Sequence, residues 1–564
     1  MIVYGYVVAL LLVTAEGRVV LNPRHRTGAV VSNAPACAQI GRDIMQEGGT
    51  VIDAAIATAL CEGVVNPSTT GVGGGFLATI YNRTTGEVFS FNSRESAPAA
   101  ATRDMFVKNP TLSSRGGLSV AIPSEIKGYW EMYKNWGGGV SWRRLLQPTI
   151  TLCEEGITMN DITFRNAVDS IEAIRMDPVL ENIFIDRETK ELYQVGQLYR
   201  RPQLARTLRI LAKEGGNALY EGSLAEDFVN DIQEKGGIIT LEDLRNYEPE
   251  KMRPVHTTIL DKDLFTIPLP GSGTALIYLL NILENYLDTD DQLTTKNYQR
   301  IVESMKFAYG ERSNLGDGNF VEGMEEFVEK LVSKEFAEET RSRIFDDRTF
   351  GDPAHYGSDV GSEADHGTGN VCAWGPSGDG ISITSSVNNV FGARFGSETT
   401  GIILNNSMDD FSSPGVTNDY GYPPAPANFI APGKRPLSSM CPSIILDKYG
   451  DIFMVVGGAG GSKILSSVAQ VILNRLYFNL DVASASHMKR IHHQLIPMNL
   501  HMEDDWLKED QDVVQGLIDI GHNITFSSNN GFVAVTTISV DDENPGEIVG
   551  VHDRRRKGSV AYLK

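Results

Sequence analysis

The sequence predicts a protein of the mixed α/β class, and three observations lead to this prediction. The first 370 residues combine helical and strand patterns, whereas residues 369–461 contain two runs that are typical of β-hairpins. Residues 351–368, which precede the first hairpin, are polar and glycine-rich and lack apolar periodicity, so they predict a loop. The chain has 564 residues, which is enough for two domains or for one large layered domain.

Three segments before residue 350 are predicted to be helical. Residues 34–59 follow a helical pattern that Gly48 and Gly49 interrupt. Residues 300–312 and 322–345 are amphipathic and carry their charges on one side, so we expect helices at the protein surface.

The predicted strands begin beside glycine-rich turns. The cluster 71–75 (GVGGG) opens a strand, FLATIYN, and no Gly-Lys-Ser/Thr follows it, so a tight turn is favoured over a phosphate-binding loop. Residues 369–374, the turn 375–380 and residues 381–389 form the first predicted hairpin. Residues 437–446, the turn 447–451 and residues 452–461 form the second.

Composition and charge exclude several classes of partner. The chain is 41% hydrophobic and 22% charged, which is typical of a globular protein. Its net charge of −22 repels phosphate backbones and anionic lipid, so nucleic acid and acidic membrane surfaces are poor partners. None of the five cysteines lies in a CxxC pair, so nothing suggests a zinc site.

The N-terminal segment predicts export. Residues 2–15 form one uncharged apolar run that is short for a membrane helix and ends in small residues, so we interpret 1–15 as a signal peptide. No Lys or Arg precedes the run, and an uncleaved anchor or a buried strand is the alternative. Export permits disulfides, and Cys37 and Cys61, which flank the helical stretch, are the best pair. Asn82 and Asn523 lie in glycosylation sequons.

Folding the first hairpin about its turn brings polar groups together. Thr368 then lies opposite Val387, within one residue of register. Ser386 and Asn388 share a strand face and can sit beside Thr368. The alternative is a polar strand face exposed to solvent.

The second hairpin suggests an anion-binding site. Pairing Leu437 with Gly460 brings Ser438 and Ser439 to Gly460 and Gly461. Two hydroxyls beside two bare N–H groups suit a carboxylate or the oxyanion of acyl transfer. The alternative is a glycine-rich strand end packed by serines.

Several ordered motifs resemble the γ-glutamyltransferase family. They are Thr400–Asn406 (TGIILNN), Met408–Pro414 (MDDFSSP), Pro436–Pro442 (PLSSMCP), Val456–Gly461 (VGGAGG), Phe91–Glu95 (FNSRE) and Gly116–Val120 (GGLSV). The resemblance covers nearly the whole chain after the signal. It implies an N-terminal-nucleophile hydrolase with a four-layered αββα sandwich, cut by itself between Gly367 and Thr368 into a large subunit (16–367) and a small subunit (368–564).

The resemblance also implies a reaction and its residues. Thr368 takes a γ-glutamyl group from glutathione or another donor, and water, an amino acid or a dipeptide accepts it, with no cofactor or metal. The freed α-amino group of Thr368 is the base that activates its hydroxyl. The roles implied are Arg94, Ser438 and Ser439 on the substrate carboxylate, Asn388, Asp410 and position 407 on its ammonium, Gly460 and Gly461 on the oxyanion, and Ser386, in place of the family's usual Thr, on the nucleophile.

Three residues depart from the family pattern. Asn370 replaces a usual His two residues after the nucleophile, Cys372 replaces a Ser, and Ser407 replaces a Glu or Gln. Ser407 is too short to reach the substrate ammonium directly, so we expect a water to fill the gap. These departures leave open a second interpretation, in which a secreted, catalytically impaired homologue binds γ-glutamyl compounds or acts without catalysis.

Overall fold

The computed structural model describes residues 28–358, 360, 367–417, 423–544 and 546–563, with only the backbone of residue 530. It also describes the backbone of two short paired strands, β1 (Leu12–Val13) and β2 (Val19–Val20). The predicted signal peptide, 1–15, otherwise lies outside the described residues. Within the described ranges, no helix is both long enough and apolar enough to cross a membrane.

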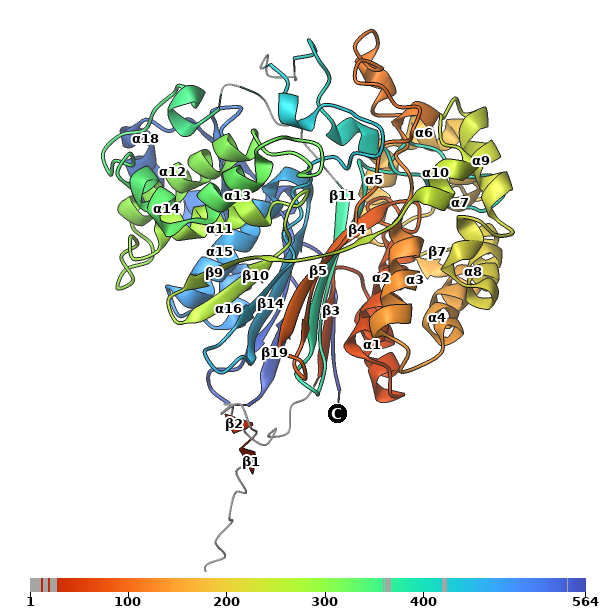
Figure 1. Ribbon diagram of the computed structural model, residues 1–564, viewed down its shortest axis with the longest axis horizontal. Coiled ribbons are helices and arrows are strands. Elements are labelled where there is room, and N and C mark those ends of the chain that lie inside the picture. The colour runs from red at the N-terminus through yellow and green to blue at the C-terminus, as the bar shows by residue number, and fades with distance from the viewer. Residues whose placement is uncertain are drawn as a thin grey trace, which may run out of the picture.

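The structure has four layers, with two sheets packed face to face between two layers of helices (Figure 1). Apolar side chains of both sheets, including Trp374, Val455 and Ile538, fill the space between the sheets. Two larger apolar cores lie between each sheet and the helices that cover it. The prediction of a mixed α/β protein is confirmed, and the layers form one sandwich.

In both central sheets, strands from distant parts of the chain lie side by side. Neighbouring strands within each are antiparallel. The seven-stranded sheet has the order β20 (Ser559–Tyr562), β3 (Ala29–Ser32), β11 (Gly367–Trp374), β12 (Gly380–Asn388), β4 (Gly75–Asn82), β5 (Glu87–Ser93) and β8 (Glu250–Met252). The six-stranded sheet has the order β19 (Ile548–Val551), β18 (Ala534–Val540), β14 (Ile452–Ala459), β13 (Ser443–Leu446), β10 (Lys262–Thr266) and β9 (Val255–Ile259). The smaller sheets are β6 (Ile157–Thr158) with β7 (Leu198–Tyr199), and β15 (Ile491–His492), β16 (Leu500–Glu503) and β17 (Ile524–Ser527).

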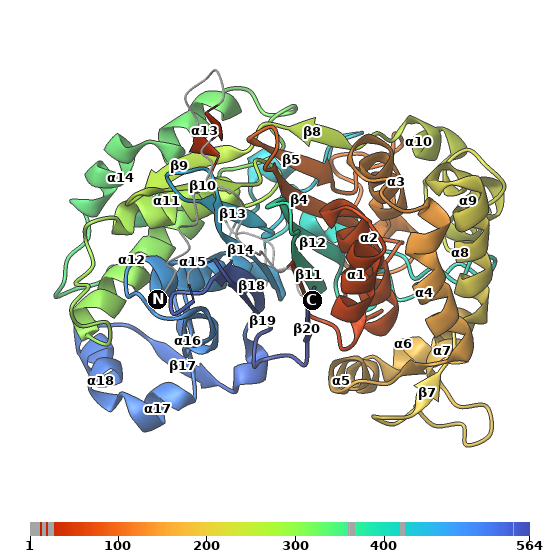
Figure 2. The ribbon, with the colours of Figure 1, turned by 90° about the horizontal axis from the view of Figure 1, so that it is seen from below.

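Helices from two parts of the chain form the outer layers, which Figure 2 shows from below. On the side of the seven-stranded sheet lie α1 (Cys37–Gln46), α2 (Val51–Val65), α3 (Glu125–Trp136), α4 (Trp142–Glu155), α5 (Asp161–Asp169), α6 (Ile171–Met176), α7 (Pro178–Phe184), α8 (Pro202–Glu214), α9 (Ala225–Glu234) and α10 (Leu241–Asn246). On the other side lie α11 (Gly273–Leu283), α12 (Thr295–Arg312), α13 (Met324–Val332), α14 (Lys334–Arg341), α15 (Ile464–Leu476), α16 (Val482–His487), α17 (Asp505–Glu509) and α18 (Gln511–Ile520) (Figures 1 and 2).

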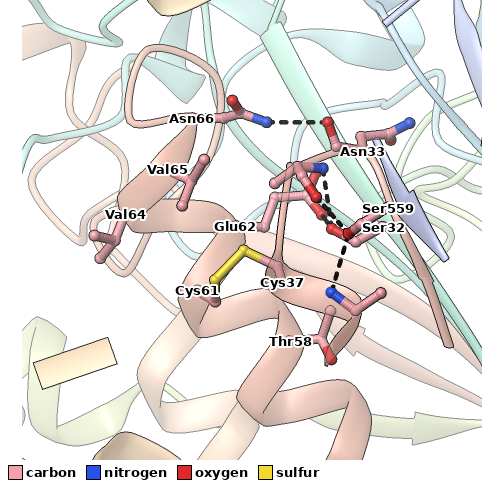
Figure 3. Close-up of a disulfide and its surroundings, with 12 residues drawn as sticks. Ser32, Asn33, Cys37, Thr58, Cys61, Glu62, Val64, Val65, Asn66 and Ser559 are labelled. Carbon is pink, nitrogen blue, oxygen red and sulfur yellow. Dashed lines mark hydrogen bonds between the residues drawn. A yellow bond between two sulfur atoms is a disulfide. The ribbon is translucent and has the colours of Figure 1, made fainter. Parts of the chain in front are cut away.

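The predicted interruption of the first helix is confirmed. α1 ends at Gln46, Gly48 adopts a positive φ of 97°, and Thr50 begins α2 with a capping box to Asp53. A disulfide between Cys37 and Cys61 ties the start of α1 to the C-terminal half of α2 (Figure 3). The other three cysteines are buried free thiols.

The prediction of a surface helix over residues 300–312 is wrong. These residues belong to α12, and apart from Arg300 and Glu311 they are buried. The helix accommodates charge inside because Lys306 Nζ binds Glu303 Oε1 at 3.2 Å and also donates to the Tyr356 hydroxyl. The charged residues that suggested a surface helix therefore include an ion pair inside the protein. In the second segment, α13 and α14 do keep one exposed side.

The first hairpin has the predicted register, whereas the second is shorter than predicted. Gly367 pairs with Asn388, and a bulge shifts the ladder by one residue before Gly369 pairs with Ser385. In the second hairpin the ladder begins at Ser443, which pairs with Val456, so the expected pairing of Leu437 with Gly460 is wrong. Pro442, which has no N–H to donate, directly precedes the observed ladder.

Candidate active site

The predicted site residues lie mainly where strands of the two central sheets end. Thr368 is at the start of β11, and Asn388 is at the end of β12, its antiparallel neighbour. Arg94 follows β5, whose last residue Ser93 pairs with Phe76 at the start of β4. β14 crosses the same region, since a Cβ at Gly457 would meet the Asn370 side chain. Gly460 follows three residues later.

Thr368 lies at the bulge and is only 2% exposed. A bulge changes the direction of the side chains beside it, and such irregularities are common next to active sites. Arg556 Nη1 donates to the carbonyl oxygen of Thr368 at 2.9 Å, and the N–H of Asn370 donates to Asn33 Oδ1 at 2.9 Å. The backbone on the C-terminal side of Thr368 is therefore held by two distant parts of the chain.

The peptide bond between Gly367 and Thr368 has a hydroxyl donor on its carbonyl. Ser386 Oγ donates to the carbonyl oxygen of Gly367 and accepts the N–H of Asn388 at 2.8 Å. A Cβ at Gly367 would lie 2.6 Å from the carbonyl oxygen of Asn388, so this position has no room for a side chain. The alternative of a solvent-exposed face is wrong, because Ser382, Thr384, Ser386 and Asn388 are all buried.

Arg94 lies between two buried carboxylates. Its Nη1 is 3.2 Å from Glu95 Oε2, its Nη2 pairs with Asp410 Oδ2, and its Nε donates to the carbonyl oxygen of Pro436 at 3.4 Å. Arg94 is 1% exposed and Glu95 is fully buried. Burial raises the pKa of Glu95 from its usual value, while the adjacent Arg94 charge opposes that shift.

Ser407 contacts a carboxylate that the sequence analysis did not assign. It begins the short 3₁₀ helix Ser407–Asp410, and its Oγ donates to Glu95 Oε1 at 2.9 Å. Asn388 Nδ2 donates to the carbonyl oxygen of Asn406 at 3.1 Å, and Asn388 Oδ1 is buried with no hydrogen-bond partner among the described residues. An unpaired buried acceptor beside an acidic cluster suits a donor such as an ammonium group.

The two predicted anion-binding pairs, Ser438 with Ser439 and Gly460 with Gly461, are held by different parts of the structure. Ser439 Oγ accepts a hydrogen bond from Arg312 Nη2 at 3.1 Å, and the Ser438 N–H donates to Pro270 O at 2.8 Å. Gly460 and Gly461 have φ values of 145° and 72°, which favour glycine, and they lead through the 3₁₀ turn Gly461–Lys463 into α15. Helix-initiating N–H groups of this kind can bind an anion.

Two of the three departures point between the sheets. The Asn370 amide lies between the hydroxyls of Thr384 and Thr536, 2.6 Å from each. Cys372 is buried beside Asn370 and Thr536, and burial raises the pKa of its thiol to about 11. The thiol is therefore protonated at neutral pH and packs as a small apolar group.

Sequence reasoning missed three contacts of the site: Glu95, Arg312 and Arg556. Glu95 adjoins Arg94 in the recognised motif, so adjacency was an available signal. Arg556 belongs to a basic run, Arg554–Lys557, that is unusual in so acidic a chain. Arg312 had no comparable signal. Across the part of the chain that the structure describes, no group of three or more His, Cys, Asp or Glu could hold a metal ion.

Comparisons with known proteins agree with this architecture. Cephalosporin acylase from Bacillus halodurans superposes with a TM-score of 0.80 at 24% identity, over 95% of this chain and 96% of that one. The chain is 37% identical to Scoloptoxin SSD14 of Scolopendra dehaani, over 94% of this chain and 92% of that protein. It is 40% identical to Glutathione hydrolase 2 of Arabidopsis thaliana, over 85% and 82%. A family model described as Gamma-glutamyltranspeptidase matches residues 37–563.

The αββα sandwich that the resemblance implied and the family match define an enzyme of the N-terminal-nucleophile hydrolase class. Within that class, the match over residues 37–563 and the identity of up to 40% show that the chain belongs to the γ-glutamyltranspeptidase family.

Proposed function

We propose that the chain cleaves itself between Gly367 and Thr368 and then transfers or hydrolyses γ-glutamyl groups, with glutathione as a donor. The glutathione hydrolases among its relatives support the donor. In the cleavage, Thr368 Oγ1 attacks the carbonyl carbon of Gly367, the peptide C–N bond breaks, and water hydrolyses the resulting ester. The products would be a large subunit, 16–367 once the signal peptide is removed, and a small subunit, 368–564.

The catalytic cycle follows from the new N-terminus. The α-amino group of Thr368 accepts the hydroxyl proton as Oγ1 attacks the γ-carbonyl carbon of the donor, and that proton passes to the leaving amine. Water or the amine of an acceptor then attacks the γ-glutamyl ester, and the proton returns to Thr368. Gly460 and Gly461 would donate their N–H groups to the oxyanion of both steps.

Binding of the glutamyl end of the substrate is assigned to Arg94 and the residues around it. Arg94, Ser438 and Ser439 would hold the α-carboxylate. Asn388 and Asp410 would hold the α-ammonium directly, and Ser407 would reach it through a water. The buried Asn388 Oδ1, which has no hydrogen-bond partner among the described residues, supports this assignment.

The observation that carries the proposal is the setting of the Gly367–Thr368 peptide. The hydroxyl of Ser386 already donates to the carbonyl oxygen on which negative charge would develop. Position 367 accepts only glycine, and the nucleophile lies at a bulge. These features favour attack on this bond over its neighbours.

The first prediction concerns processing. Thr368→Ala removes the attacking hydroxyl, so we expect one uncut chain on a denaturing gel, whereas the wild type gives two fragments. N-terminal sequencing of the smaller fragment should begin at Thr368, and only the cut protein should release the amine of a γ-glutamyl anilide. The matched control is Thr368→Ser, which keeps a hydroxyl and should still be cut. A smaller fragment that begins elsewhere would contradict the assigned bond.

The same experiment distinguishes an active enzyme from the alternative of a catalytically impaired homologue. If the wild type is cut at Thr368 but releases no amine, the chain processes itself without turnover. The function would then be binding of γ-glutamyl compounds, and equilibrium binding of a glutamate analogue would measure it.

A further inference from the structure

A second concave site lies at the N-terminal end of α8, and none of the proposed active-site residues lines it. The pocket has a volume of about 250 Å³. Four of its lining residues are arginines: Arg187, Arg200, Arg201 and Arg206. No Asp or Glu is among the lining residues, although the chain as a whole carries a net charge of −22.

Several arginines of the molecule pair with carboxylates, whereas these four do not within the described residues. Arg144 pairs with Glu47 and Arg300 with Asp346, each through two nitrogens. By contrast, no ion pair joins any of the four pocket arginines to an acidic side chain within the described part of the chain. Within the described residues, the charge of these arginines is therefore not balanced by a paired carboxylate.

Arg201 is the least expected of the four because it is 4% exposed. Its Nη2 donates to the carbonyl oxygen of Gly401 at 3.1 Å and its Nη1 to that of Gly63 at 3.4 Å, while Nε has no partner among the described residues. Since Gly401 also lines the pocket, the guanidinium lies in the pocket wall. Carbonyl groups do not neutralise a cation, and an uncompensated buried charge is costly.

The helix that begins at this pocket adds a second source of positive potential. α8 has 13 residues, Pro202 is its first, and Arg201 in the N-cap position makes no side-chain capping bond within the described structure. The first-turn residues Gln203 and Leu204 line the pocket. The N–H groups of a first helical turn have no partners inside the helix and carry a partial positive charge.

We propose that this pocket binds a tetrahedral oxyanion of the phosphate or sulfate class, free or as a small ester. Guanidinium groups bind such anions through paired hydrogen bonds, and a helix N-terminus supplies further donors. The anion would neutralise Arg201, which pairs with no carboxylate among the described residues. The volume leaves room for an organic group beside the oxyanion.

The test is isothermal titration calorimetry of the full-length protein with inorganic phosphate and, separately, with phenyl phosphate. Ionic strength is held constant with chloride so that general screening does not contribute. The test variant carries Arg200→Gln and Arg206→Gln, two exposed lining positions whose loss should not disturb folding. The matched control carries Arg143→Gln and Arg253→Gln, which remove the same charge from exposed positions outside the pocket.

We expect saturable one-to-one binding to the wild type and to the control. The test variant should bind at least about tenfold more weakly, because each lost charge-assisted bond contributes that much or more. Binding of only one of the two probes would identify the free ion or the ester as the ligand and would still support the site. Absence of saturable binding of both probes, or equal weakening in test and control variants, would overturn the proposal.

Discussion

At the scale of single residues, the charge balance around Arg94 decides what the site can hold. One guanidinium faces two buried carboxylates, those of Glu95 and Asp410, so among these three residues there is an excess of one negative charge when both carboxylates are ionised. A substrate ammonium would compensate that excess. Removing Arg94 would take its guanidinium away from two buried carboxylates, and breaking a buried pair typically costs about 3–5 kcal/mol. Arg94→Ala is therefore expected to weaken folding as well as binding.

A prediction at this scale concerns Ser407. We expect Ser407→Gln to lower the Michaelis constant for a γ-glutamyl substrate roughly tenfold, with little change in kcat. The longer amide can keep the bond to Glu95 through its N–H₂ group and accept from the ammonium through its oxygen. Steady-state kinetics on a γ-glutamyl anilide measures both constants. Glutamine is chosen over glutamate because it adds no third carboxylate.

The control for this prediction is Ser407→Ala. It removes the hydroxyl from Glu95 Oε1 without adding an acceptor, so it should not lower the Michaelis constant. An equal gain from Ala and Gln would show that bulk or polarity at position 407, and not the acceptor, limits binding.

The resemblance to the γ-glutamyltransferase family predicted part of this arrangement. The motifs around Arg94, Ser407 and Asp410 led to a single cluster, and contacts among these segments are observed. The sequence did not predict that Ser407 bonds to Glu95, because that contact depends on the approach of two segments 312 residues apart. Likewise, sequence spacing did not predict that Arg556, near the C-terminus, contacts the backbone of Thr368.

At the scale of elements, a short segment holds the glycine turn before α15. Ser462 Oγ donates to Gln494 Oε1 at 3.0 Å, and His492 lies 3.0 Å from the same oxygen. Ser466, in the first turn of α15, contacts His492 Nδ1 at 2.7 Å. Burial lowers the pKa of His492 to about 3, so it stays neutral at physiological pH. The segment 492–494 therefore fixes the residues that follow Gly460 and Gly461.

The prediction at this scale is a selective loss of kcat in Gln494→Ala. If the glycine N–H groups serve the oxyanion, loosening their turn should lower kcat by about tenfold or more and leave the Michaelis constant nearly unchanged. Gln494→Glu keeps the acceptor for Ser462 and should restore most of the rate. The control is Gln515→Ala on the exposed side of α18. A rise in the Michaelis constant alone would contradict this positioning role.

Element predictions succeeded where local signals and packing agreed. The tight turn at residues 375–380 defined the first hairpin, and its register followed within one residue. In the second hairpin, residues 437–442 bond to Pro270 and Arg312 instead of extending the ladder. In α12, charged residues that suggested a surface helix form ion pairs and hydrogen bonds inside the protein. The periodicity of the sequence does not reveal such internal partners.

At the scale of the whole molecule, the two proposed subunits share both central sheets. β11 and β12 lie between β3 and β4, so small-subunit strands are flanked by large-subunit strands. β13 pairs with β10 in the same way. Cleavage at Gly367 would break one peptide bond and none of these ladders.

We therefore expect the cut fragments to stay together. On size-exclusion chromatography under native conditions they should elute as one species at the position of uncut Thr368→Ala, and they should separate only in denaturant. Separate elution of the two fragments without denaturant would contradict the shared sheets.

Two buried carboxyl groups, which bond to residues of β12 and β3, make the stability of the protein depend on pH. Glu125 accepts hydrogen bonds from Ser385 at 2.7 Å and from Tyr129 at 2.8 Å, and burial raises its pKa to about 8. Glu62 accepts from Ser32 at 2.7 Å, and burial raises its pKa to about 7 (Figure 3). Each group is protonated in the folded protein at a pH where the unfolded chain has lost that proton.

The sign of the effect follows from proton binding. Below about pH 4.5 both states hold the proton, and the full stability is present. Between pH 4.5 and about 7 for Glu62, or about 8 for Glu125, the folded state binds more protons, so the free energy of unfolding falls as pH rises. For Glu125 the loss between pH 5 and pH 8 is on the order of 3 kcal/mol.

Glu125→Gln should remove this part of the pH dependence. The amide stays neutral, so the free energy of unfolding should fall less steeply with pH than in the parent, by on the order of 3 kcal/mol between pH 5 and pH 8. Both proteins should carry Thr368→Ala, because urea unfolding of one uncut chain avoids the concentration dependence of two fragments. The control is Glu188→Gln, an exposed carboxylate that should leave the slope unchanged. An identical slope in parent and Glu125→Gln would show that Glu125 is ionised in the folded protein, and its buried charge would then need a cationic partner.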